Sequence, residues 1–322
     1  MPNPEPRQPD EGTDRPPAPP GHRQGAYAAR RRRRPAFASP QWLFLPALIF
    51  LALFWVAPLG PGLMISCEKP IPRTRSFEWV GLANYQMLLS EATFRHNLLL
   101  SFYYLIGVVS LVTPIAYIVA LVISGRSRAL GAIRALFLIP WIVPPVVSAL
   151  VFRSMADPDI GPLAALYQYI SGNADLIPLQ SGFWAMVNVI LHSVWRSVPI
   201  LTLFLVAGMT TISDELHEAA QVDGATPWQR FCTITVPLTR SHLATGLLLI
   251  SAFTLQDAET IYAMTPGALR YGTEVAAVRL FREAFDYDRI HIAAAVGTFL
   301  LAAGVILMAL YLTLFRRAEA TT

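Results

Sequence analysis

Polar side chains inside long apolar tracts are the residues with which this sequence could do chemistry. Asn188, His192, Trp195 and Pro199 recur at helical spacing, so a helix would carry them on one face, with Arg196 beside them. Ionisable groups inside a membrane span are costly, and they are candidates for function by default. If this tract crosses a membrane, the group indicates one wall of a polar pathway.

A second polar group lies further along the chain. Phe253, Gln256, Asp257 and Thr260 would fall within an arc of about 100° on a helix, with Glu259 off its edge. Apolar or aromatic walls with a few hydrogen-bonding groups suit a sugar. The predicted substrate pathway therefore comprises Asn188, Trp195, Arg196, Gln256, Asp257 and Glu259. The alternative is that Arg196 pairs with Asp257 or Glu259, while the other residues, His192 included, join helices to one another.

Enzyme chemistry is not indicated. The sequence has no H-E-x-x-H or G-x-S-x-G motif, and its six histidines are scattered, so neither a catalytic nor a metal site is expected. The only lysine, Lys69, lies in SCEKPIP without the glycines of a phosphate-binding loop. We therefore expect no cofactor in this chain, and any ATP and Mg²⁺ would be bound by another polypeptide.

The composition indicates a membrane protein, because 54% of the residues are hydrophobic and 14% are charged, against about 25% charged in soluble domains. Residues 1–41 hold ten of the 26 prolines and end near an arginine run at 30–34. This segment is predicted to be a disordered cytoplasmic tail. Next to a membrane span, the arginine run is expected to set topology and touch anionic lipid rather than nucleic acid.

Residues 42–322 are predicted to form an all-α transmembrane domain. Six tracts are long enough to cross about 30 Å of hydrocarbon, near 42–64, 97–124, 130–155, 183–210, 241–263 and 291–315. With both termini cytoplasmic, the inner segments hold 15 arginines and the outer loops nine Lys or Arg. Cys67 and Cys232 would then lie on opposite sides of the membrane, so no disulfide between them is expected. The first tract carries Pro58 and Pro61, so we do not read it as a cleaved signal.

The inner segment between the fourth and fifth tracts predicts a pair of short helices. Ser213 can cap the first helix and Gly224 can end it. Thr226 and Gln229 form a capping box for the second helix, and Pro237 is expected to stop it. Trp228, Phe231 and Ile234 would offer an apolar docking face. The segment is either a connector packed on its own helix ends or a rigid element that docks on a partner.

The same stretch, EAAQVDGATPWQRFCTITVP, resembles the EAA loop of ABC-importer permeases. The matching positions are Glu218, Ala219, Ala220, Gly224, Ile234 and Pro237, with Val236 in place of the usual leucine. The resemblance implies that these six residues, together with Asp223, couple the chain to an ATPase. WVGLANY at 79–85, LFLIPWIVPPVVSALVFR at 136–153 and VWRSVPILTLFLVAGM at 194–209 are similar to further stretches of the carbohydrate branch, which includes maltose-, trehalose- and glycerol-phosphate-type permeases.

This resemblance implies a bacterial plasma-membrane permease whose EAA loop is a coupling helix lodged in an ATPase subunit. It implies a second, similar permease, two ATPase copies and an external substrate-binding protein or lipoprotein as partners, and a sugar as cargo. Two alternatives stay open. One is another cargo, such as glycerol phosphate, a polyamine or an amino acid; the other is a proton-coupled carrier that uses Asp257 or Glu259.

Overall fold

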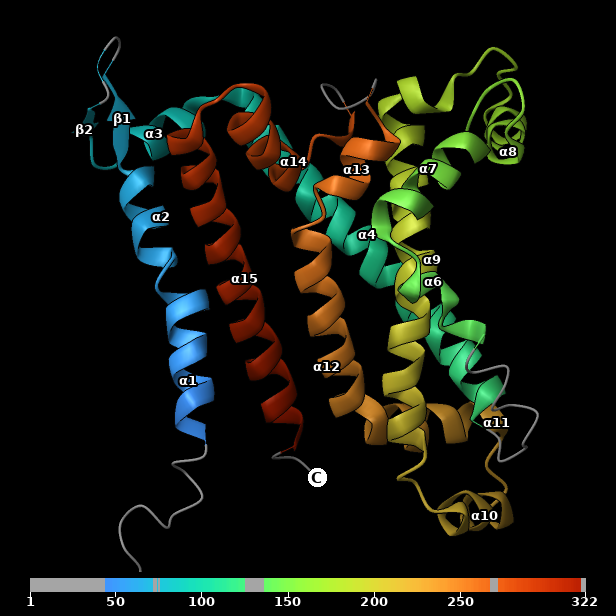
Figure 1. Cartoon of the computed structure of the whole chain (residues 1–322). Coiled ribbons are helices and arrows are strands. Elements are labelled where there is room, and N and C mark those ends of the chain that lie inside the picture. Colours follow the sequence, from blue (N-terminus) through green and yellow to red (C-terminus); the bar gives the residue numbers. More distant parts are fainter. Residues whose placement is uncertain (1–43, 72–73, 75, 125–135, 267–271, 320–322) are drawn as a thin grey trace, which may run out of the picture. The chain divides into compact units, whose positions relative to one another are not determined.

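The computed structural model describes residues 44–71, 74, 76–124, 136–266 and 272–319, so the predicted tail 1–41 lies outside it. The described chain is mostly helical (Figure 1). Five of its helical tracts are long and apolar enough to cross a membrane: Leu45–Ser66, Ala92–Ile123, Gly182–Met209, Pro227–Leu255 and Ile290–Thr313. The chain divides into two compact units, Met1–Leu53 and Phe54–Thr322.

The described part of the first unit is helix α1 (Leu45–Leu51), which continues into a π-helical turn, η3 (Ala52–Val56). Every residue from Phe44 to Leu53 is exposed, although the segment is almost entirely apolar. A helix that is apolar all round and buries nothing within its own chain suits a lipid environment. This agrees with the first predicted span.

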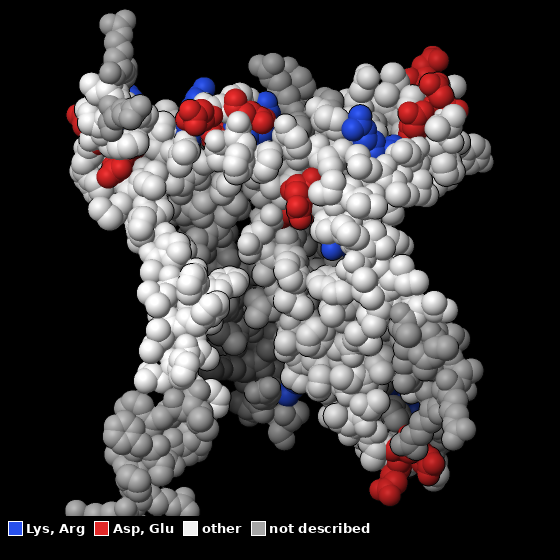
Figure 2. Space-filling view, in the orientation of Figure 1, with Lys and Arg blue, Asp and Glu red and all other residues white. Residues whose placement is uncertain are grey.

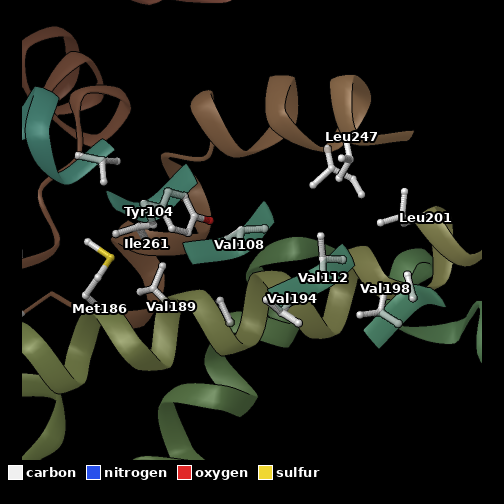
Figure 3. Close-up of a cluster of buried hydrophobic side chains, with 14 of the residues drawn as sticks. Tyr104, Val108, Val112, Met186, Val189, Val194, Val198, Leu201, Leu247 and Ile261 are labelled. Atoms are coloured by element: carbon white, nitrogen blue, oxygen red, sulfur yellow. The ribbon is translucent and has the colours of Figure 1, made fainter. Parts of the chain in front are cut away.

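The core of the second unit lies where α4 (Ala92–Ile123) and α12 (Val236–Leu255) pack against α9 (Gly182–Met209). Val108, Val112 and Ala116 recur every four residues along α4, so they form one buried stripe. Val198 and Leu201 of α9 belong to the same cluster (Figure 3). Small and β-branched side chains let the helices approach closely, which is typical of helix packing in membranes.

Short elements connect and flank these helices. They are α2 (Leu59–Ser66), β1 (Glu68–Pro70), β2 (Phe77–Trp79), α3 (Ala83–Ser90), α6 (Ile139–Ile142), α7 (Pro145–Met155), α8 (Pro162–Ser171), η4 (Pro178–Gln180), α13 (Glu259–Met264), α14 (Ala276–Phe281) and η7 (Arg282–Asp286). The long helix α15 (Ile290–Glu319) follows η7 and contains the last of the five apolar tracts. Strands β1 and β2 pair antiparallel with Lys69 opposite Glu78. The buried Asn84 side chain holds this hairpin by donating to the carbonyls of Ser66 and Glu68 at 2.8 and 2.9 Å.

Helices α10 (Asp214–Val222) and α11 (Pro227–Arg230) form the predicted helix pair. They lie at the end of the second unit opposite α13 and α14 (Figure 1). Gly224 follows α10 with φ +81°, as expected for a residue that ends a helix. Ser213 is at the cap position of α10, but its side chain makes no capping hydrogen bond.

The expectation that Pro237 ends the second short helix is wrong. Helix α11 continues through a π-helical turn, η5 (Phe231–Thr235), into α12, so the helical tract runs from Pro227 to Leu255. The π-helical turn ends with the Val236 N–H bonded to the Phe231 carbonyl, and Pro237 then falls in the first turn of α12. The proline directly follows a π-helical turn, in which the regular i to i−4 bonding is already replaced, so it does not end the helix.

The fifth span was predicted near 241–263, but the helical tract begins earlier, at Pro227, and also ends earlier, at Leu255. Helix α12 ends at Leu255, and the chain restarts as α13 at Glu259.

The third predicted span, 130–155, is also not one helix in the described part. Val143 and Pro144 adopt extended ψ angles of 131° and 135°, and they separate α6 from α7. Residues 130–135 lie outside the described residues, so the six-span count stays a prediction.

Substitution of Gly246 by valine should destabilise the second unit. A Cβ at this position would lie 2.6 Å from Leu201 Cδ1 and 3.3 Å from Phe204 Cδ2, and overpacking of this kind costs about 1–3 kcal/mol. Gly304→Val is the matched control, because nothing lies within 4 Å of its Cβ position. Thermal unfolding in detergent should show a lower midpoint for Gly246→Val alone. Equal midpoints would contradict the close packing of α9 and α12.

Candidate functional site

A cavity of about 580 Å³ opens among α4, α6, α7, α9, α12, α13 and α14. Four of the six residues predicted for the substrate pathway line it: Arg196, Gln256, Asp257 and Glu259. Tyr104, Trp141, Ser193, Phe253 and Phe281 are further lining residues. The cavity therefore combines aromatic walls with a small set of polar groups.

The breaks in the helices explain why polar groups gather here. The chain leaves the helical path between Leu255 and Glu259, so Gln256 and Asp257 stand at the end of α12 rather than along its side. The break at Val143 and Pro144 also borders the cavity, because Trp141 and Pro145 line it. Backbone without regular hydrogen bonds is tolerated at membrane depth only where protein or a polar cavity surrounds it.

Hydrogen bonds hold the Asp257 carboxylate in place. Its Oδ2 accepts from the Tyr104 hydroxyl at 2.9 Å, and that hydroxyl lies 2.6 Å from Ser193 Oγ. Its Oδ1 accepts from the Thr260 backbone N–H at 3.3 Å. Tyr104 and Ser193 are both buried. These bonds connect α4, α9 and α13 around the Asp257 carboxylate. Tyr104 and Asp257 meet here although 153 residues separate them in the sequence.

Arg196 does not form the alternative ion pair considered for it. No salt bridge between described residues joins Arg196 to Asp257 or Glu259, and the Arg196 Nε has no hydrogen-bond partner among them. Its guanidinium carbon lies 6.0 Å from the centroid of the Trp141 ring, within reach of a cation–π contact. The Trp141 ring in turn meets Phe253 edge-on, with centroids 5.6 Å apart.

Asn188, His192 and Trp195 are not among the residues lining the cavity. Asn188 is fully buried; its Oδ1 accepts from the Tyr167 hydroxyl at 3.2 Å, and its Nδ2 lies 3.2 Å from the Met264 sulfur. His192 Nε2 is 2.9 Å from Ser148 Oγ, and Trp195 packs against Phe152 with ring centroids 5.5 Å apart. These residues join α9 to α7, α8 and α13, as in the helix-joining alternative. Asn188 and Trp195 thus lie outside this cavity, and their place on the substrate pathway stays a prediction.

The second candidate site is the α10–α11 pair. The capping box of α11 is confirmed, because the Gln229 N–H donates to Thr226 Oγ1 at 3.3 Å and the Thr226 N–H donates to Gln229 Oε1 at 2.8 Å. Such reciprocal bonds hold the chain rigid at a helix start.

The motif residues in the α10–α11 segment face two ways. Glu218, Ala219, Asp223 and Gly224 are exposed and Ala220 is half-buried, whereas Ile234 is buried and Pro237 half-buried. The acidic side chains of α10 gather at this end of the protein (Figure 2). Trp228 is 71% exposed. The segment thus has one outward surface for a partner and one surface packed on its own helices.

Sequence comparison identifies relatives of known type. Residues 82–320 match the family model described as "Binding-protein-dependent transport system inner membrane component". The trehalose/maltose transport system permease protein MalF of Thermococcus litoralis is 31% identical over 228 residues, which cover 70% of this chain and 76% of that protein. The sn-glycerol-3-phosphate transport system permease protein UgpA of Yersinia enterocolitica is 30% identical over 261 residues, covering 78% and 86% of the two chains.

Solved structures share the fold. A chain of a bacterial ABC transporter involved in the import of the acidic polysaccharide alginate superposes with a TM-score of 0.72 at 20% identity, covering 86% of this chain and 94% of that chain. The same transporter type has also been solved in complex with an alginate pentasaccharide-bound periplasmic protein.

Removal of the Tyr104 hydroxyl should destabilise the cavity wall. Tyr104→Phe leaves the half-buried Asp257 carboxylate without the hydroxyl that donates to it, and a hydrogen bond to a charged group contributes about 1.5–3 kcal/mol. Tyr103→Phe is the matched control, because Tyr103 is exposed on the same helix. The thermal unfolding midpoint in detergent should fall for Tyr104→Phe and not for the control. An unchanged midpoint for both would show that the bond contributes nothing.

Proposed function

Because this chain belongs to the binding-protein-dependent transport system inner membrane component family, we propose that it is the permease subunit of an ATP-driven bacterial importer for a di- or oligosaccharide. Family membership makes it a multi-pass membrane permease component rather than an enzyme. The observation that carries the sugar assignment is the cavity, in which aromatic rings and hydrogen-bonding groups lie together. The names of relatives, which include a trehalose/maltose permease, support the same assignment.

The cavity suits a sugar for physical reasons. The ring faces of Trp141 and Phe253 can pack against the apolar faces of a pyranose. Gln256, Asp257 and Glu259 can accept hydrogen bonds from sugar hydroxyls, and Gln256 can also donate. Arg196 completes the set of polar groups, so Arg196, Gln256, Asp257 and Glu259 form the proposed substrate pathway.

The charges in the cavity favour a neutral sugar over a phosphate. Recognition of phosphate uses arginine forks or several cations. The charged residues among the described cavity lining are one cation, Arg196, and two carboxylates, Asp257 and Glu259. Glycerol phosphate, a polyamine and an amino acid remain the alternative cargoes. Coupling to protons through Asp257 or Glu259 is less favoured, because the family couples to a binding protein.

The proposed partners are inferred from the missing phosphate-binding loop and from the family's dependence on a binding protein. The sequence has no phosphate-binding loop, so ATP and Mg²⁺ would be held by two copies of a separate ATPase subunit. A second, similar permease would complete the pathway, and an external binding protein would deliver the sugar. The complex of a related transporter with its periplasmic protein supports the last of these.

The α10–α11 pair would be the coupling element that contacts the ATPase. The helical tract from Pro227 to Leu255 runs without interruption from this pair to the break that carries Gln256 and Asp257. At 1.5 Å per residue its length is about 43 Å. A displacement of α11 would therefore be transmitted to the cavity wall along one continuous helical tract. The arginine bias of the sequence supports a cytoplasmic position for this pair and for both termini.

Gly224→Asp should abolish uptake and leave sugar binding by the external protein intact. Gly224 has φ +81° with open space around its Cβ position, so the substitution strains the exposed turn and adds a charge to its surface. Gly172→Asp is the matched control, because Gly172 has φ +67° with equally open space after α8. We would measure uptake in proteoliposomes and co-purification of the ATPase. Full uptake by Gly224→Asp would contradict the coupling role.

Gln256→Ala should slow uptake without loss of the ATPase from the complex. A hydrogen bond to the sugar contributes about 1 kcal/mol, which corresponds to a change of five- to tenfold. Gln86→Ala, at an exposed position of α3, is the control and should transport normally. Uptake would be measured with saturating binding protein, so that the permease step limits the rate. Equal rates for the two variants would remove Gln256 from the substrate pathway.

A further inference from the structure

Phe281 lines the cavity from α14, which lies at the end of the second unit opposite α10 and α11 (Figure 1). Among the described lining residues it is the one that belongs to α14. Its ring packs against Tyr262 of α13, with centroids 5.1 Å apart, and against Phe285 of η7 at 4.8 Å. Figure 1 shows α13 and α14 together at this end. The side of the cavity formed by α14 is therefore an aromatic side chain packed between two other aromatic rings.

Charged residues that precede and follow Phe281 in the sequence form a network of ion pairs. Arg279 Nη2 lies 2.8 Å from Glu283 Oε1 and 3.1 Å from Glu91 Oε1, which belongs to the segment that begins α4. Arg282 Nη1 lies 3.0 Å from Glu274 Oε2. Acidic and basic side chains alternate across this end of the protein in Figure 2.

Arg289 and Asp286 extend the network. Arg289, which directly precedes α15, has its Nη1 3.6 Å from Glu283 Oε2. Arg282 Nε is 3.5 Å from Asp286 Oδ2, and the Tyr262 hydroxyl donates to Asp286 Oδ1 at 3.4 Å. The network thus connects α14 to α4, α13 and α15.

The burial of these charges is costly and incompletely compensated. Glu283 is 0% exposed and Glu274 is 3% exposed. Burial raises the pKa of Glu274, and the guanidinium groups of Arg282 and Arg279 oppose that rise. Both Glu283 oxygens and the Arg279 Nε lack a hydrogen bond of good geometry among the described residues. Buried ion pairs often stabilise less than apolar packing would, so their value here lies in the geometry that they impose.

We propose that Phe281 closes the cavity at its outer end, and that Arg279 and Arg282 are positioning residues that hold α14 over it. Opening requires α14 to move, and the arginines then exchange or loosen their contacts with Glu91 and Glu274. This proposal rests on the proposed function in treating this end as the entrance for cargo. A purely structural anchor is the alternative, in which the network stabilises the fold without controlling access.

A cysteine inside the cavity would report on the closure. Ser197→Cys in a background with Cys67→Ser and Cys232→Ser places one thiol on the cavity wall. In spheroplasts without cargo, a membrane-impermeant maleimide added outside should react slowly with it. Phe281→Ala should raise the labelling rate severalfold, and Thr254→Cys, a second lining position, should report the same change. Phe77→Ala is the control, because Phe77 of β2 is 61% exposed and does not line the cavity.

The ion pairs are tested with the same thiol. Arg279→Gln should also raise the labelling rate, because it removes the partner of Glu91 and Glu283, and Arg279→Lys should return the rate toward that of the parent by restoring the charge. A lower unfolding temperature for Arg279→Gln with unchanged labelling would overturn the positioning role. Unchanged labelling in Phe281→Ala would overturn the closure itself.

Labelling needs neither sugar nor ATP, so failure of the two proposals can be distinguished. If the parent complex took up no sugar but Phe281→Ala still opened the cavity to the reagent, the proposed function would fall and the closure would stand. If uptake were normal and labelling did not respond, the closure alone would fall.

Discussion

Hydrocarbon offers no partners to the backbone, and this constraint determines where polar chemistry can occur in this protein. Along the membrane-spanning tracts the backbone is helical, so its donors and acceptors are satisfied within each segment. The helical path is broken at Val143–Pro144 and again between Leu255 and Glu259, and both breaks border the same cavity. The irregular backbone and the polar side chains therefore occur together, because each requires surroundings that lipid cannot provide.

The carboxylate of Asp257 shows how the rest of the core serves this cavity. A charge withdrawn from water needs hydrogen bonds. The Tyr104 hydroxyl of α4 supplies one to the half-buried Asp257, and the same hydroxyl lies 2.6 Å from Ser193 Oγ of α9. The close packing of α4 and α9 along the Val108, Val112 and Ala116 stripe is what keeps that hydroxyl in place. An apolar interface thus positions the hydroxyl that bonds to the carboxylate at the cavity.

Local signals were sufficient to predict some features and not others. The Thr226 capping box and the Gly224 helix end depend on residues a few positions apart, so the sequence alone specified them. Helical spacing correctly grouped Asn188 with His192 on one face of α9, but it could not tell which neighbour covers that face. The covering elements are α7 and α8, whose Ser148 and Tyr167 bond to these residues.

The lining residue Tyr104 was beyond the reach of sequence reasoning, because it lies in an unbroken apolar helix and its partner is far along the chain. The helix end predicted at Pro237 was wrong, whereas the backbone at Val143 and Pro144 is extended and does end a helix. The difference is the π-helical turn η5 before Pro237, which no residue pattern announced.

Two rigid connections meet at the cavity from opposite ends. From one end, the continuous tract Pro227–Leu255 ties the α10–α11 pair to Gln256 and Asp257. From the other, the ion pairs of Arg279 and Arg282 tie Phe281 to α4 and to Glu274. Helix α4 contacts both α12 and α14, so a shift of α12 along α4 changes the support on which α14 rests. An importer needs its two ends to open in alternation, and a shared helix with a carboxylate bonded across it is a physical means by which one end can respond to the other.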